Sequence, residues 1–191
     1  MGTRWLEVRR HSLTKKAPGR GRGSHLSAEG IALAREIGAQ LGPIAYVMTS
    51  VSPRAVETAV AMGYAVDDTI DLPSGYVAGE VEHHDQWAWA RPYERYAELI
   101  ARRGELAAVA RAHRAIWTEV VAAVPDGSAA LLVSHGGSIE PALVSCLIEA
   151  DHASWGAPFG HCDGVRLSFE GGRFTGVQFH RAPALKPETE G

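Results

Sequence analysis

The sequence predicts an α/β fold, arranged as a three-layer α/β/α sandwich with a mostly parallel central sheet. Short apolar runs typical of buried strands alternate with longer stretches in which apolar residues recur at helical spacing. Three of these runs end in polar loops that lead into a predicted helix, as expected when crossover helices join parallel strands. The 191 residues suit one domain, which we place at residues 1–182, followed by a loose tail at 183–191.

The composition excludes several classes of protein. A formal net charge of -3 argues against a broad nucleic-acid-binding face. Cys146 and Cys162 are too few for a disulfide framework, so we expect a reducing, cytoplasmic environment. Arg4 and Glu7 interrupt any apolar core of a signal peptide, and no uncharged run is long enough to cross a bilayer. We therefore expect neither nucleic acid nor a membrane as a partner, and the sequence does not predict the oligomeric state.

The first strand is expected over residues 3–9. Glu7 and Arg9 are unusual in a buried parallel strand, which favours a partly exposed one. Residues 11–24 then form a basic loop whose glycine spacing does not fit a dinucleotide-binding fingerprint. Two interpretations of this loop stay open: a surface loop, which we favour, or a basic lip over an anionic substrate.

The next helix is expected to begin at Ser27, a good N-cap, and to stop at the Gly-Pro pair 42–43. Residues 44–48 form a short apolar run between turn signals and predict a buried strand. Pro53 suits the first position of the helix that follows. Arg54 then lies in its first turn, where it points back toward the strand ends.

The rest of the chain continues this alternation. The expected elements are a small strand around Ile70, helices over 91–124 broken at Gly104, a strand over 129–133, a helix from Ser138 to about 149, and a hairpin of strands 165–169 and 174–180.

Three strand-end loops carry the candidate chemistry: Arg10 with His11, the segment containing Arg54, and the Ser-His-Gly-Gly run around His135. Parallel strands place their carboxyl ends on one side of a sheet, so these loops are expected to converge. Two histidines, two arginines and the backbone N–H groups that follow His135 form a pocket for a phosphoryl group. An imidazole nitrogen in it can accept that group and pass it to water, and a leaving alkoxide needs an acid from elsewhere.

These motifs resemble the histidine phosphatase superfamily, branch 1, whose fold is phosphoglycerate mutase-like. The matching segments are Arg10-His11-Ser12 followed by Thr14, Ser50 with Arg54-Ala55-Val56-Glu57-Thr58-Ala59, and Ser134-His135-Gly136-Gly137. The resemblance implies that His11 becomes phosphorylated and that His135 assists it. It implies substrate-binding roles for the following residues: Arg10, Ser12, Thr14, Arg54 and Gly136. It also implies that no metal ion or organic cofactor is needed.

The resemblance places the proton donor at a glutamate after the second helix. Glu80 and Glu82 both qualify, and in an extended segment they share one face. Glu80 is slightly favoured, and the alternative stays open. Ser12 departs from the family pattern by replacing a glycine, and Pro53 directly precedes Arg54 rather than lying earlier.

Other polar clusters have simpler interpretations. Residues 83–85, His-His-Asp, lack the usual spacing of metal ligands, so a solvated loop or a substrate contact is expected. Cys162 is expected to be a buried loop cysteine rather than a nucleophile. Trp87 and Trp89 are expected in the core or in a pocket wall, and in the wall they would favour an organic, partly apolar substrate.

The predicted function is that of a histidine acid phosphatase-like hydrolase, which hydrolyses phosphomonoesters through a phosphohistidine on His11. The partner is a small phosphorylated substrate, with a phosphoprotein as a further option. A phosphoglycerate mutase-type phosphotransferase is the alternative within enzymes, and it ranks lower because the chain is compact and lacks an obvious closing insertion. A non-catalytic phospholigand-binding or regulatory domain is the alternative outside enzymes.

Overall fold

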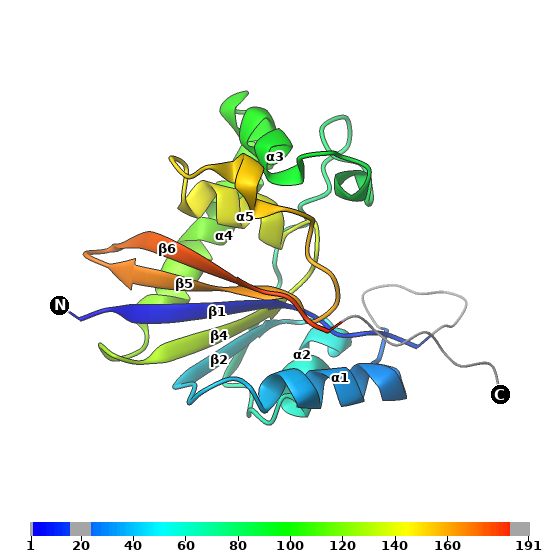
Figure 1. Ribbon diagram of the computed structural model, residues 1–191, viewed down its shortest axis with the longest axis vertical. Helices are drawn as coiled ribbons and strands as arrows, with labels where there is room; N and C mark the ends of the chain where they lie inside the picture. The colour runs from blue at the N-terminus through cyan, green and yellow to red at the C-terminus, as the bar shows by residue number, and fades with distance from the viewer. Residues whose placement is uncertain (1, 16–23, 184–191) are drawn as a thin grey trace.

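The computed structural model describes residues 2–15 and 24–183, and their central feature is one twisted sheet (Figure 1). The order of its described strands is β3-β2-β4-β1-β5-β6. Pairing is parallel from β3 through β1, and β5 and β6 are antiparallel additions at one edge. The bounds are β1 Arg4–Arg10, β2 Tyr46–Ser50, β3 Asp68–Ile70, β4 Ala129–Ser134, β5 Gly164–Glu170 and β6 Arg173–His180.

Helices cover both faces of this sheet. Helices α1 and α2 lie on one face, and α4 and α5 lie on the other with α3 beyond them (Figure 1). The bounds are α1 Ala28–Gly38, α2 Pro53–Ala61, α3 Pro92–Ala101, α4 Glu105–Ala122 and α5 Ile139–Cys146, with short 3-10 helices η1 Asp85–Trp87 and η2 His152–Trp155. The predicted three-layer fold with a mostly parallel sheet is confirmed.

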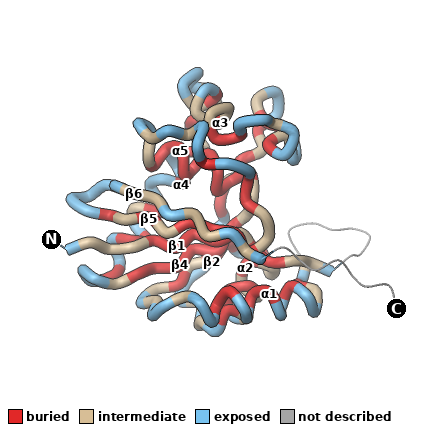
Figure 2. The backbone as a smooth tube through the Cα atoms, in the orientation of Figure 1, coloured by how far each residue is buried: buried red, intermediate tan, exposed pale blue. Residues whose placement is uncertain are grey.

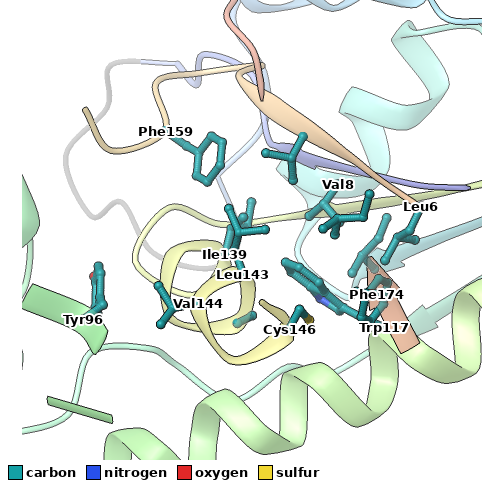
Figure 3. Close-up of a cluster of buried hydrophobic side chains, with 14 of the residues drawn as sticks. Leu6, Val8, Tyr96, Trp117, Ile139, Leu143, Val144, Cys146, Phe159 and Phe174 are labelled. Carbon is teal, nitrogen blue, oxygen red and sulfur yellow. The ribbon is translucent and has the colours of Figure 1, made fainter. Parts of the chain in front are cut away.

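The core lies between the sheet and its helices, and burial is deepest along the central strands (Figure 2). Successive strand residues point to opposite faces, so Leu6 and Val8 of β1 face α4 and α5. Trp117 of α4 and Leu143 of α5 pack against them in the larger core (Figure 3). This packing fixes β1 and β4 and therefore the loops that follow them.

The expectation of a partly exposed first strand is wrong. Glu7 is 2% and Arg9 is 3% exposed, because β1 lies in the middle of the sheet between β4 and β5. The Glu7 carboxylate accepts hydrogen bonds from Arg9 at 3.4 Å and from Arg166 of β5 at 3.2 Å. The charges of Glu7 and Arg9 are thus buried as an ion pair, and Arg166 also pairs with Glu7.

Other expectations fare differently. The small strand near Ile70 and the final hairpin are present, whereas α5 ends at Cys146 rather than near residue 149. Most of the basic loop and residues 184–191 of the predicted tail lie outside the described residues. In the part of the chain that is described, no helix is long and apolar enough to span a membrane.

Candidate active site

The carboxyl ends of β1, β2 and β4 bring the predicted loops together. Arg10 pairs with Ser134 in the β1–β4 ladder, and the backbone N–H of His11 donates to the Ser134 carbonyl at 2.8 Å. The residues that follow each strand therefore meet: the ring centroids of His11 and His135 lie 5.2 Å apart. Arg54 reaches the same place from the first turn of α2.

His11 is held as a neutral imidazole with a defined tautomer. Its Nδ1 lies 2.7 Å from the Ser12 carbonyl oxygen, which can only accept, so Nδ1 carries the proton and donates. The lone pair is then on Nε2. Burial lowers the pKa of His11 well below its ordinary value, and the nearby His135, Arg10 and Arg54 lower it further.

His135 is oriented by two side chains. The Nε–H of Arg54 donates to its Nδ1 at 3.4 Å, and its Nε2 lies 2.7 Å from Ser50 Oγ. Since Nδ1 accepts, Nε2 carries the proton and donates to the serine. The second histidine is therefore a hydrogen-bond donor on the opposite tautomer from His11.

Arg10 is half-buried beside this pair. It donates to the Phe159 carbonyl at 2.6 Å, and burial lowers its pKa. A Cβ on Gly136 would approach the Arg10 side chain to 3.1 Å, so the glycine leaves room for the guanidinium. Both arginines and both histidines of the predicted pocket thus lie together at the carboxyl ends of the strands.

A pocket of about 180 Å³ opens over His135 and Arg54. Its wall includes two titratable side chains outside the predicted catalytic set, Asp71 and His83. Gly136 also lines it, as the sequence suggested. Asp71 directly follows β3, whose Ile70 pairs with Ser50 of β2, so its position is fixed by the sheet.

The structure does not bring Glu80 or Glu82 to this pocket. The Glu80 carboxylate accepts hydrogen bonds from the backbone N–H groups of Glu105 and Leu106, at 2.8 and 3.3 Å, and so caps the start of α4. Glu82 is exposed and accepts from the Gly79 N–H at 3.0 Å. Neither glutamate is among the residues that line the pocket.

Ser12 and Thr14 are also placed differently from expectation. The Ser12 hydroxyl donates to the Gly30 carbonyl at 2.7 Å, and its N–H donates to Thr58 Oγ1 at 2.9 Å. Ser12 therefore ties the end of β1 to α1 and α2, and only its carbonyl reaches His11. Thr14 forms a β-bridge with Leu26 and is absent from the described wall of the pocket.

Several residues without a predicted catalytic or binding role surround the site. The ring of His161 lies 5.6 Å from that of His11, and burial lowers its pKa to about 4. Burial raises the pKa of Cys162 to about 11, which does not suit a nucleophilic thiolate. Trp87 is 48% exposed with the Arg10 guanidinium 6.0 Å from its ring, whereas Trp89 packs on Tyr96 in the core.

Glu140 was missed altogether. It lies in the first turn of α5, is fully buried, and accepts hydrogen bonds from the N–H groups of Gly137 and Phe159. The Gly137 N–H, expected to face an anion, is thus engaged within the protein. The available signal was a carboxylate in an otherwise apolar helix. Among the described residues, no cluster of three or more His, Cys, Asp or Glu could hold a metal ion.

The fold and the site together define an α/β domain with a histidine–arginine anion pocket at the carboxyl ends of its strands. The model of the histidine phosphatase superfamily (branch 1) matches residues 8–181, and the chain belongs to this family.

Solved structures agree on the fold. A mycobacterial glucosyl-3-phosphoglycerate phosphatase aligns with a TM-score of 0.63 at 21% identity, covering 95% of this chain and 100% of its own. Phosphoserine phosphatase from Entamoeba histolytica, solved with 3-phosphoglyceric acid, gives 0.64 at 16% identity, covering 93% and 97%. YhfR from Bacillus stearothermophilus gives 0.61 at 19% identity, covering 94% and 98%. A search of curated proteins found no match.

Proposed function

We propose that the protein is a phosphatase that hydrolyses phosphomonoesters through a phosphohistidine on His11. The observation that carries this proposal is the state of His11: a neutral imidazole whose Nδ1 donates to the Ser12 carbonyl, with the Nε2 lone pair available for attack. Membership of the family supports the same role.

The proposed reaction has two steps. The Nε2 of His11 attacks phosphorus, the bond to the leaving oxygen breaks, and the phosphoryl group moves to the imidazole. Water then attacks phosphorus, the P–N bond breaks, and inorganic phosphate leaves. Arg10, Arg54 and His135 stabilise the charge on the transferring group. The reaction uses neither a metal ion nor an organic cofactor.

We propose that the proton for the leaving group comes from a side chain in the wall of the pocket. Asp71 supplies a carboxyl group among the described residues that line it, and the pairing of β3 with β2 holds it beside Ser50. Its acid form would protonate the leaving oxygen in the first step, and its carboxylate would take a proton from water in the second. His83, on the same wall, is the alternative donor.

The size of the pocket beside Arg54 and His135 supports a small substrate. About 180 Å³ holds a phosphate and a small organic group, which agrees with the phosphoglycerate bound to the Entamoeba enzyme. A phosphoprotein, a mutase-type transfer and a non-catalytic phospholigand-binding role remain the alternatives to be separated by experiment.

The test is turnover of 4-nitrophenyl phosphate by the native protein, His11→Ala and His152→Ala. We expect His11→Ala to abolish turnover and the control, a histidine of η2, to keep it. A phosphoprotein that is labile to acid and stable to base should form in the native protein alone. Native protein that binds phosphate without turning over any ester would establish the non-catalytic alternative. Equal turnover in all three would remove the nucleophile from His11.

A further inference from the structure

Glu140 is a buried carboxylate next to the candidate active site that the proposed reaction does not use. All eight residues of α5 are buried, and Glu140 is 0% exposed. A carboxylate is costly to bury unless hydrogen-bond donors surround it. The hydrogen-bond donors around Glu140 therefore indicate its role.

Each oxygen of Glu140 accepts a hydrogen bond from a backbone N–H of a neighbouring loop. Oε2 accepts from the N–H of Gly137 at 2.6 Å, and Oε1 accepts from the N–H of Phe159 at 3.1 Å. Gly137 belongs to the loop that presents His135 and has a φ of 84°, in the left-handed region that favours glycine. Phe159 belongs to the loop before β5. One side chain thus joins the loop after β4 to the loop before β5.

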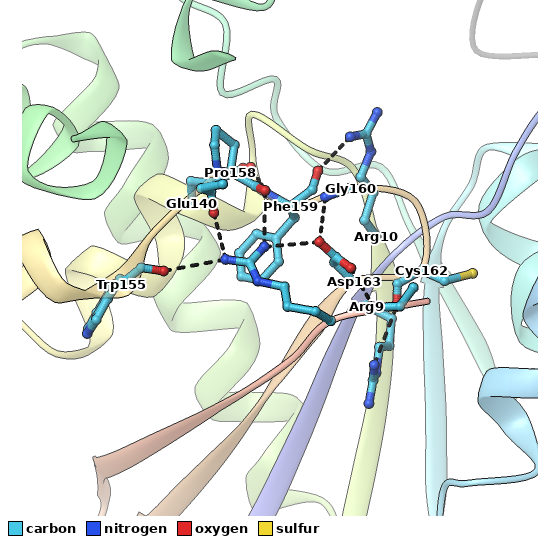
Figure 4. A network of polar contacts seen from close by, with 12 residues as sticks. Arg9, Arg10, Glu140, Trp155, Pro158, Phe159, Gly160, Cys162 and Asp163 are labelled. Carbon is cyan, nitrogen blue, oxygen red and sulfur yellow. Dashed lines mark hydrogen bonds and ion pairs between the residues drawn. The ribbon is translucent and has the colours of Figure 1, made fainter. Parts of the chain in front are cut away.

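The second of these loops holds Arg10. The Phe159 carbonyl accepts from the Arg10 guanidinium at 2.6 Å, so Phe159 bonds Glu140 through its N–H and Arg10 through its carbonyl (Figure 4). Arg181 holds the same loop before β5, because it donates to the Pro158 carbonyl and to Asp163, each at 3.0 Å. Burial raises the pKa of Glu140. The negative charge of Glu140 in turn raises the pKa of Arg10, against the effect of burial.

We propose that Glu140 is a positioning residue, which sets the Arg10 guanidinium and the loop after His135 in register so that both meet one phosphoryl group. This role rests on the proposed function, because it concerns the same anion pocket. Glu140 does not itself touch substrate. It acts by fixing two backbone segments, each of which carries a group that does.

Glu140→Gln is the sharpest substitution. Glutamine keeps the shape, but one carboxylate oxygen becomes an NH2 group that cannot accept the hydrogen bond of a backbone N–H. One of the two ties is therefore lost and a buried donor faces another donor. Ser145→Ala is the matched control: Ser145 is buried on the same helix, and its hydroxyl bonds to Ala110 and Ala142 rather than to a loop of the site.

The readouts are binding of inorganic phosphate by calorimetry, kcat/KM for 4-nitrophenyl phosphate, and the free energy of unfolding in urea. We expect Glu140→Gln to lower both phosphate affinity and kcat/KM by about tenfold, as one misplaced charge-assisted contact would. Ser145→Ala should lose stability and keep both within about twofold. Glu140→Gln that is folded and binds phosphate as tightly as native protein would overturn the proposal.

A double-mutant cycle separates positioning from general stability. If Glu140 acts through Arg10 or the His135 loop, its substitution adds little to the effect of Arg10→Ala or His135→Ala on kcat/KM. Full additivity with both would overturn the positioning role. If Glu140→Gln does not fold, Glu140→Asp retains two acceptors on a shorter side chain, and its unchanged phosphate affinity would equally overturn the role.

Phosphate binding is measured apart from turnover, so the two proposals can fail separately. A native protein that binds phosphate but hydrolyses no ester would refute the phosphatase proposal, while the effect of Glu140→Gln on binding would still decide the positioning role.

Discussion

The hydroxyl of Ser50 lies 2.7 Å from Nε2 of His135, and this contact joins the end of β2 to the loop that follows β4. Arg54 donates to the other ring nitrogen, so the serine oxygen receives the only proton of the imidazole. The ring proton of His135 thus sits on Nε2, where Ser50 accepts it. Ser50 is buried, and its effect on His135 can be tested without touching any charged group.

Ser50→Ala should weaken phosphate binding and lower kcat/KM by about tenfold, because the His135 ring loses the acceptor that orients it. Stability should fall by about 0.5–1.5 kcal/mol, the net contribution of one hydrogen bond. Steady-state kinetics and urea unfolding measure the two effects. Ser154→Ala, which removes an exposed hydroxyl in η2, serves as the control and should change neither. Native kinetics in Ser50→Ala would show that the contact does not orient His135.

Stability should decrease as the pH falls below about 6.5, the ordinary pKa of histidine. Burial lowers the pKa of His11, and lowers that of His161 to about 4. In this range the unfolded chain binds protons that the folded protein does not, so protonation favours unfolding. For His161 the loss should be complete below about pH 4, where both states carry the proton. Urea unfolding between pH 7 and 5 should give a shallower slope for His161→Asn, and identical slopes would contradict the burial of a neutral ring.

Asp71→Asn and Glu80→Gln should behave differently toward the leaving group. Without its acid, the enzyme should show a kcat/KM about 100-fold lower for alkyl phosphates. The kcat/KM for 4-nitrophenyl phosphate should fall less, because its leaving group needs little protonation. Glu80→Gln should keep both rates and lose up to about 1 kcal/mol of stability, since it weakens the cap of α4. His83→Asn provides the comparison for the alternative donor. A selective loss in Glu80→Gln instead would return the acid role to Glu80, the slightly favoured of the two glutamates in the sequence analysis.

Breaking the buried pair of β1 should be more harmful than removing it. Arg9→Leu leaves the Glu7 carboxylate buried with Arg166 alone, and the free energy of unfolding should fall by about 3–5 kcal/mol. Replacing both residues by leucine should recover most of this, because neither charge then needs to be desolvated. Thermal or urea unfolding of the three proteins gives the answer, and a double variant no more stable than Arg9→Leu would contradict it.

The sequence predicted what depends on local signals. The alternation of strands and helices, Pro53 at the start of α2 and the three strand-end loops each follow from residues within one short segment. Their convergence follows from the parallel sheet, so His11, Arg54 and His135 were correctly expected to meet.

What the sequence did not predict depends on partners far along the chain. The burial of Glu7 requires Arg166, which reaches it only when β5 pairs with β1. Glu80 looked like a proton donor because nothing near it in the sequence shows that its carboxylate meets the first turn of α4. Glu140 was hidden because one of its two donors is the N–H of Phe159, 19 residues further along the chain.

The place of β1 in the sheet has a consequence for biosynthesis. Among the described strands β1 comes first in the sequence, yet its two neighbours in the sheet begin at Ala129 and Gly164. The strand that carries Arg10 and His11 must therefore wait, unpaired, until most of the chain has been translated. Until then the hairpin of β5 and β6 cannot dock, and a nascent chain stalled before it should bind no phosphate. Phosphate binding should therefore appear only after the sheet is complete.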